Sequence, residues 1–139
     1  MLPIVRFIFA CDAAIYDLAS SKWSITSPWH TVRMPRGVTK GHGQEELWLY
    51  AQLADGLGEF EFGVELRYFE PTKSNGLVLG RSQVERRVFP HKLEVHEFVF
   101  KMSRVPFPRT GQYDFRLTCR GQPLENGIAF LDVLPGRGT

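Results

Sequence analysis

Three glutamates lie on one face of the clearest strand pattern in the chain. Glu59, Glu61 and Glu65 alternate with apolar residues, so an extended backbone places all three carboxylates on the same side. Carboxylates grouped in this way can bind a cation or act as a general acid and base. A solvated outer face, with Arg67 as a charge partner, is the simpler interpretation, because outer faces of sandwiches normally carry charge. An enzyme that uses this cluster is therefore the less favoured hypothesis.

Other residue types that could do chemistry lack the spacing that chemistry requires. The four histidines, His30, His42, His91 and His96, do not form the closely spaced pairs that are typical of structural zinc. The glycines and Lys40 of residues 35–46 precede a strand pattern, whereas a phosphate-binding loop must open a helix. No Gly-x-Ser-x-Gly motif is present. The sequence predicts no catalytic residue, no metal and no cofactor.

The two cysteines, Cys11 and Cys119, are too few for a disulfide framework. Both occupy positions that the strand patterns predict to face inward, so a single bridge between them stays geometrically open. Two buried free thiols that pack as small hydrophobic groups are the favoured interpretation.

Length and composition indicate one globular domain over residues 1–139. The chain is 43% hydrophobic and 23% charged, and its 17 basic and 15 acidic residues are interleaved to a net charge of +2. That balance argues against a nucleic-acid partner, and no apolar run approaches the ~18 residues of a membrane helix. Residues 8–11 faintly resemble a lipoprotein cleavage site, but Pro3 and Arg6 interrupt the apolar run that a signal peptide needs. We therefore expect a cytoplasmic protein.

Apolar residues recur with a period of two along most of the chain, which predicts strands. Residues 47–53 and 60–68 are expected to pair as a hairpin across Asp55-Gly56. A first strand should place Val5, Phe7, Phe9 and Cys11 on one face. Further strands are expected at 22–34 (broken at Pro28), 77–88 (at an edge), 93–102 (with a bulge), 113–119 and 128–134. Residues 35–46 are expected to form a mobile loop, and 135–139 a frayed tail.

A tyrosine that follows a proline- and glycine-containing turn identifies the architecture. Residues 107–117 place Gly111 and Tyr113 at the head of a strictly alternating strand. This arrangement is typical of the tyrosine corner of immunoglobulin-like sandwiches, in which the hydroxyl bonds back to the upstream turn. The sequence therefore predicts an all-β, immunoglobulin-like antiparallel β-sandwich of about 7–8 strands with little or no helix. Phe115 stands where immunoglobulin domains carry a disulfide cysteine, so that disulfide is absent.

Aromatic and basic side chains supply the candidate interaction surface. Trp48 and Tyr50 alternate with inward-facing leucines and so fall on the second face of their strand. Tryptophan and tyrosine are enriched in binding hot spots, but the segment between Trp23 and Trp29 could instead cover both rings. The full set of candidate residues is Trp23, Trp29, Trp48, Tyr50, Arg86 and Arg87.

Two short motifs carry a resemblance to a known family. They are Phe9-Ala10-Cys11-Asp12 and the run 107–115, which is followed by Cys119-Arg120-Gly121-Gln122-Pro123-Leu124. In these motifs, and in the order of its elements, the chain resembles a bacterial family of single immunoglobulin-like sandwich domains of unknown function. The resemblance implies the fold, and it implies no activity, substrate or catalytic residue.

The leading hypothesis is a non-enzymatic interaction or accessory domain. A protein partner, or self-association through a strand edge or the Trp48 and Tyr50 face, would suit a sandwich. The alternative is a small-ligand or carbohydrate-binding module that uses aromatics of the Trp23–Trp29 segment. The glutamate-based enzyme is the third hypothesis.

Overall fold

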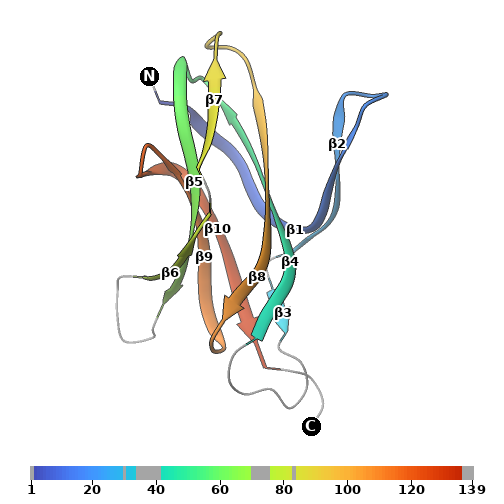
Figure 1. Cartoon of the computed structure of the whole chain (residues 1–139), viewed down its shortest axis with the longest axis vertical. Helices are drawn as coiled ribbons and strands as arrows, with labels where there is room; N and C mark the ends of the chain where they lie inside the picture. Colours follow the sequence, from blue (N-terminus) through green and yellow to red (C-terminus); the bar gives the residue numbers. More distant parts are fainter. Residues whose placement is uncertain (1, 30, 34–41, 70–75, 83, 136–139) are drawn as a thin grey trace.

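The chain folds as two β-sheets that pack face to face (Figure 1). The computed structural model describes residues 2–29, 31–33, 42–69, 76–82 and 84–135. Within these ranges every regular element is a strand, so the all-β prediction is confirmed, and no helix could span a membrane. The strands are β1 (Ile4–Asp17), β2 (Lys22–Trp29), β3 (Thr31–Arg33), β4 (His42–Ala54), β5 (Gly58–Phe69), β6 (Leu77–Arg81), β7 (Glu85–Phe89), β8 (His96–Phe107), β9 (Gly111–Cys119) and β10 (Gln122–Leu134).

One sheet has the order β2-β1-β4-β8, and the other has the order β3-β10-β9-β5 with β6 and β7 both on the outer side of β5. Neighbouring strands are antiparallel except for β3, which runs parallel to β10. The described strands outnumber the expected seven or eight, because the first part of the chain contributes three strands and the predicted 77–88 strand is divided into two.

The predicted hairpin between residues 47–53 and 60–68 is wrong. β4 pairs with β1 and β8, whereas β5 pairs with strands of the other sheet. Asp55 and Gly58 both have positive φ, and the turn between them carries the chain from one layer to the other. The apolar residues of the two segments line opposite sides of the core, one side from each sheet. Two strands that share one face of a single sheet would show the same alternation, so the sequence pattern does not distinguish the two arrangements.

The first strand also differs from its prediction. A register shift between Val5 and Phe7 turns Val5 into the core and leaves Phe7 exposed on the outer face. Cys11 therefore lies on the outer face of its sheet, opposite Trp48, while Cys119 lies in the core opposite Phe62. Both thiols are buried and free, so the expectation that both point inward is wrong. Burial raises the pKa of each thiol.

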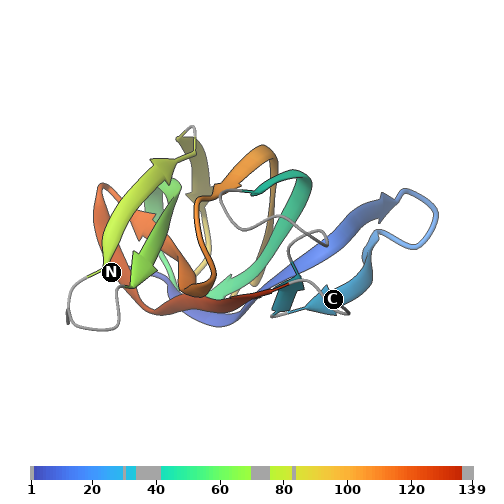
Figure 2. The ribbon, with the colours of Figure 1, turned by 90° about the horizontal axis from the view of Figure 1, so that it is seen from below.

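The ends of β1 and β2 form a projecting hairpin (Figures 1 and 2). β4 pairs with β1 only as far as Cys11, whereas β2 pairs with β1 as far as Asp17. The last six residues of β1 therefore belong to a two-stranded ribbon, and Ile15, Tyr16 and, in the turn that follows, Leu18 are exposed. Lys22–Trp29 continues through Pro28 without a break, which Pro tolerates because β2 is an edge strand.

The bounds of several elements differ from those that the sequence predicts. Residues 42–46 of the predicted mobile loop belong to β4, while residues 35–41 lie outside the described residues, as do 136–139 of the predicted tail. β8 begins at His96, and the residues before it form a turn in which Leu93 is exposed. The change of parity between Leu93 and Phe98 therefore marks the entry into the strand and not a bulge.

An aromatic cluster from both sheets forms one end of the core. Phe62 of β5 packs against Phe98 of β8 with ring centroids 4.7 Å apart, and Phe60 and Phe89 surround the pair. All four rings are buried. Edge-to-face and tilted contacts of this kind add to the stabilisation from buried apolar area, so this cluster ties the two sheets together.

The corner at the start of β9 has the expected hydrogen bond. The buried hydroxyl of Tyr113 donates to the carbonyl of Arg109 at 2.6 Å and accepts from the amide of Arg109 at 3.2 Å. Gly111 has φ of +141°, and a Cβ there would lie 2.9 Å from Cε1 of Tyr68. The corner therefore requires both a glycine and a tyrosine, and burial raises the pKa of Tyr113.

We expect Tyr113→Phe to lower the free energy of unfolding by about 1–2 kcal/mol, because it leaves the Arg109 carbonyl without the buried hydroxyl that donates to it. Chemical denaturation monitored by fluorescence measures the change. Tyr68→Phe is the matched control. The ring centroids of Tyr68 and Tyr113 lie 4.9 Å apart, and the Tyr68 hydroxyl forms no hydrogen bond among the described residues. Equal losses in the two variants would show that the corner bond does not stabilise the fold.

Candidate functional site

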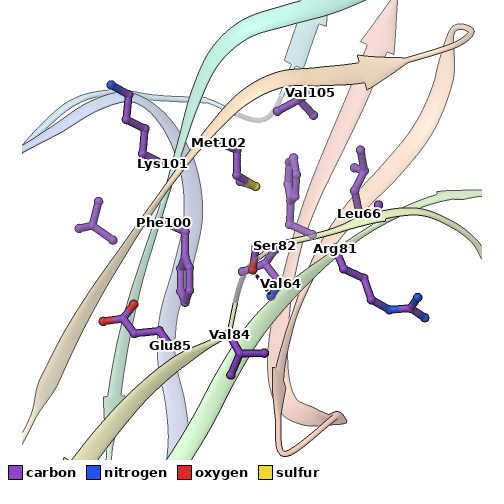
Figure 3. A pocket seen from close by; sticks show the side chains of 13 residues that line it. Val64, Leu66, Arg81, Ser82, Val84, Glu85, Phe100, Lys101, Met102 and Val105 are labelled. Carbon is purple, nitrogen blue, oxygen red and sulfur yellow. Dashed lines mark hydrogen bonds between the residues drawn. The ribbon is translucent and has the colours of Figure 1, made fainter.

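A pocket of about 720 Å³ opens between the two sheets, where β8 faces β6 and β7 (Figure 3). β8 is the last described strand of one sheet, and β6 and β7 lie along the edge of the other. The pocket is therefore the lateral opening of the sandwich, and it is lined along its length by strand edges.

The walls of the pocket are apolar. Phe100 and Met102 point into it from β8, and Val64 and Leu66 face them from β5 (Figure 3). Phe115 of β9 lines it from the same sheet as β5. Lys101, which also lines the opening, directs its side chain away from the interior (Figure 3). An occupant of this pocket would therefore be held by apolar side chains.

The main chain of β8 contributes to the opening as well. Val99 and Lys101 pair with Tyr50 and Trp48, whose side chains lie on the outer face, so they share that face. They nevertheless line the inter-sheet pocket, which places their backbone along its mouth. The carbonyl of Glu97 accepts a hydrogen bond from Arg87 of the opposite sheet, so it points away from β4. This side of β8 presents backbone groups to the opening.

A bulge shapes the opposite wall. Arg81 and Glu85 are separated by three residues, but their partners Glu65 and Phe62 on β5 are separated by two. Ser82 holds this irregular segment: its amide donates to the carbonyl of Val64 at 2.8 Å, and its hydroxyl accepts from the amide of Val64 at 2.9 Å. The hydroxyl takes the place of a backbone carbonyl, and the bulge keeps the edge of the second sheet irregular.

Arg87 of β7 connects the two sheets. Its guanidinium lies 4.2 Å above the ring of Phe98 and bonds both the carbonyl of Glu97 and, at 2.8 Å, the carboxylate of Glu85. The second predicted arginine, Arg86, points outward and forms an exposed ion pair with Glu61 at 2.8 Å. The two neighbouring arginines thus have different surroundings, because successive side chains of a strand alternate in direction.

Trp48 and Tyr50 lie on the outer face of the first sheet. Tyr50 is buried between the ring of Phe9, 5.2 Å away, and the carboxylate of Glu97, to which its hydroxyl donates. Trp48 is half-buried, and the ammonium of Lys101 lies 5.3 Å above its ring. Among the described side chains, Phe9 of β1 packs on Tyr50 and Lys101 of β8 lies over Trp48, while the Trp23–Trp29 segment forms the far edge of the sheet.

Burial is the largest influence on the ionisation of Tyr50. Together with the hydrogen bond and the negative charge of Glu97, it raises the pKa of Tyr50 to about 12. The phenol therefore stays protonated and donates to Glu97 throughout the neutral range. Tyr50 holds the Glu97 carboxylate in place beside the edge of β8.

The predicted glutamate cluster is part of a network of ion pairs. Glu61 pairs with Arg86, and Glu65 pairs with Arg81 at 3.2 Å. Glu59 is exposed, and its carbonyl accepts a hydrogen bond from Arg120. The expected charge partner, Arg67, pairs with another residue.

Arg67 forms the most buried ion pair among the described residues, and sequence reasoning missed its partner. Its Nε and Nη2 donate to the two carboxylate oxygens of Asp114 at 2.9 and 2.5 Å. The side chain of Asp114 is only 1% exposed and that of Arg67 11%. Asp114 lies on the outer face of β9 beside Tyr113, where an alternating pattern predicts a solvated residue.

The remaining candidates do not converge on one site. Trp23 is half-buried against Tyr16 on the projecting hairpin and does not line the pocket beside β8. The backbone of Trp29 pairs with Ala10, and its side chain lies outside the described part of the chain, as do residue His30 and the side chain of His42.

His96 stacks on Phe89, and His91 is exposed in the turn before β8. No group of three potential metal ligands occurs among the residues that the structure describes.

Sequence reasoning did not identify the β8 edge as a site. Its signal is the alternation Glu97-Phe98-Val99-Phe100-Lys101, in which apolar residues face the core and opposite charges flank a valine on the other face. This alternation is visible in the sequence, but its position at the edge of a sheet depends on the tertiary structure.

No protein-family model and no curated protein sequence matches this chain.

Proposed function

We propose that the protein is a non-enzymatic interaction module of immunoglobulin-like architecture, and that it binds an extended polypeptide segment along β8. The observation that carries the proposal is the coincidence of an apolar inter-sheet pocket with a strand edge whose backbone lines its mouth. Peptides that add a strand to a sheet use both features: main-chain hydrogen bonds supply affinity, and alternating side chains enter pockets.

The strand order supports the immunoglobulin-like assignment. In that fold, the first, second and fifth strands share one sheet, and the third, sixth and seventh strands form the other. Here β1, β4 and β8 are neighbours in one sheet, and β5, β9 and β10 are neighbours in the other. β9 would then be the penultimate strand of the fold, which is the strand that carries the tyrosine corner.

The same comparison explains why β8 lies at an edge. In the constant-type immunoglobulin sandwich, a further strand precedes the fifth and pairs with its outer side. Here the six residues Pro90–Val95 connect β7 directly to β8 and contain no strand. The position beside β8 that such a strand would fill is the mouth of the pocket. A strand from another polypeptide would complete the sheet.

The alternatives lack a comparable site in the described structure. The three glutamates of the enzyme hypothesis lie on an outer face, where two of them form ion pairs with arginines. The carbohydrate hypothesis requires Trp23 beside a cleft, whereas that residue packs on an exposed two-stranded ribbon. The β8 edge therefore supports the interaction hypothesis best.

A displayed library of ten-residue peptides tests the proposal. We expect the protein to select peptides that alternate apolar and polar residues, and these peptides should shift the amide resonances of Val99 and Lys101 in NMR spectra. Val99→Pro should abolish binding, because proline removes an N–H that points away from β4.

Val99→Ala is the matched control, since it shortens the same side chain and keeps the N–H. Peptide binding that persists in Val99→Pro would contradict the proposal. Selected peptides that shift the amide resonances of β2 and leave those of β8 unchanged would also contradict it. A library that yields no binder to a monomeric protein would contradict it as well.

A further inference from the structure

We infer that the segment bound along β8 is the β8 strand of a second copy of this chain, paired antiparallel about a two-fold axis at Val99. This inference rests on the proposed function, because it names the partner of the same edge. In such a dimer Val99 faces Val99 of the other copy, and residue 97 faces residue 101.

The backbone of β8 is oriented for this pairing. The Glu97 carbonyl points away from β4, where it bonds Arg87 of the opposite sheet. N–H and C=O groups of alternate residues in a strand point to the same side, so those of Val99 and Lys101 point there too. Two copies of Val99 would then exchange a pair of N–H···O=C bonds at the centre of the interface.

Charge complementarity selects the register. Glu97 and Lys101 lie on the outer face of β8, two residues on either side of Val99. Pairing centred on Val99 places Glu97 of each copy opposite Lys101 of the other, and it does so twice because the axis is two-fold. Cross-strand pairs of opposite charge stabilise a sheet, whereas any register that places like charges opposite each other is unfavourable.

Both charged side chains are already positioned on the outer face. The Tyr50 hydroxyl donates to Glu97, and the Trp48 ring lies beneath the Lys101 ammonium. A side chain held by a neighbour loses less conformational entropy when it forms an ion pair. The predicted role of the two aromatics thus becomes indirect, since they orient the charges that would meet the second copy.

The core side of the strand fits the same register. Phe98 and Phe100 alternate with the outer residues and so lie on the core side of β8. In this register Phe98 of each copy would face Phe100 of the other copy. Phe100 lines the pocket, and the added strand would cover its open side. A lysine on an edge strand normally discourages pairing. Here the opposing Glu97 removes that penalty only for a partner with the same sequence in this register.

The opposite edge of the same sheet offers a competing partner. β2 runs antiparallel to β8, so β2 of one copy could pair with β8 of the next and form an open chain of molecules. β2 carries Lys22 and lacks an acidic residue along its eight positions. It therefore offers no partner for Lys101, and the closed dimer through β8 is the better match.

Charge reversal followed by analytical ultracentrifugation tests the inference. We expect the wild-type protein to form a dimer that weakens as salt is added. Lys101→Glu and Glu97→Lys should each raise the dimer dissociation constant by about tenfold or more, because each change makes two attractive contacts repulsive. The variant that carries both changes should recover most of the affinity, since the opposite charges are restored with their positions exchanged.

Lys22→Glu, at the other edge of the sheet, should leave the dissociation constant unchanged, and circular dichroism checks that every variant is folded. A monomeric wild-type protein, failure of the double variant to recover, or a large effect of Lys22→Glu would overturn the inference. If the wild-type protein is a monomer and library peptides bind along β8, the dimer inference is wrong and the proposed function is supported. If Val99→Pro leaves the dimer intact and no peptide binds at β8, both the dimer inference and the proposed function are wrong.

Discussion

Asp114→Ala is expected to lower the free energy of unfolding by about 3–5 kcal/mol, the range typical of breaking a buried ion pair. The substitution leaves the Arg67 guanidinium, which is 11% exposed, without the two carboxylate oxygens that accept its hydrogen bonds. A charge held away from water without a partner is strongly unfavourable. Urea denaturation at neutral pH measures the loss.

Two comparisons isolate the buried pair. Glu61→Ala removes the acid of an exposed pair, in which Glu61 is 45% and Arg86 72% exposed, and it should change stability by at most about 1 kcal/mol. Replacing both partners, as Asp114→Leu with Arg67→Met, should restore part of the loss, because no unpaired charge stays buried. Equal effects of Asp114→Ala and Glu61→Ala would show that Asp114 is solvated in solution.

Phe62→Ala is expected to be as damaging, with a loss of about 3–5 kcal/mol. Phe62 is fully buried, and its ring contacts Phe60, Phe89 and Phe98 from both sheets. Truncation removes apolar contacts and leaves a cavity that the surrounding rings cannot fill, since they are held by their own strands. The same denaturation experiment applies.

Phe7→Ala is the matched control for this prediction. Phe7 is the same residue type on an exposed part of β1, so its truncation should change stability by about 0.5 kcal/mol or less. A Phe62→Ala protein as stable as Phe7→Ala would show that the two sheets do not pack through this cluster. Thermal melts of the two variants provide an independent check.

Local patterns determined the strand content. The alternation of apolar and polar residues in 60–68 and 113–119 specifies strands with one buried face, because side chains of a strand alternate with a period of two. The tyrosine corner is similarly local: the bond from Tyr113 to Arg109 spans four residues, and Gly111 supplies the backbone conformation. Both features could therefore be predicted from the sequence.

Sheet membership could not be predicted in this way. The Asp55-Gly56 turn is compatible with a hairpin and with a crossing between layers, and only packing of the two inner faces decides for the crossing. The single extra residue between Val5 and Phe7 reversed the expected faces of Phe7 and Cys11. A bulge of one residue leaves little trace in a pattern of period two, yet it exchanges the two faces of the strand.

The candidate site shows the same division. The sequence by itself determined the residues with hot-spot character, Trp48 and Tyr50, and the alternation of charge along 97–101. Only the tertiary structure placed β8 at an edge, opened a pocket beside it, and set Tyr50 against Glu97 and Trp48 against Lys101. The physical reason is that alternation depends on the geometry of one strand, whereas an edge is defined by which distant segments pair and which position beside a strand is left unfilled.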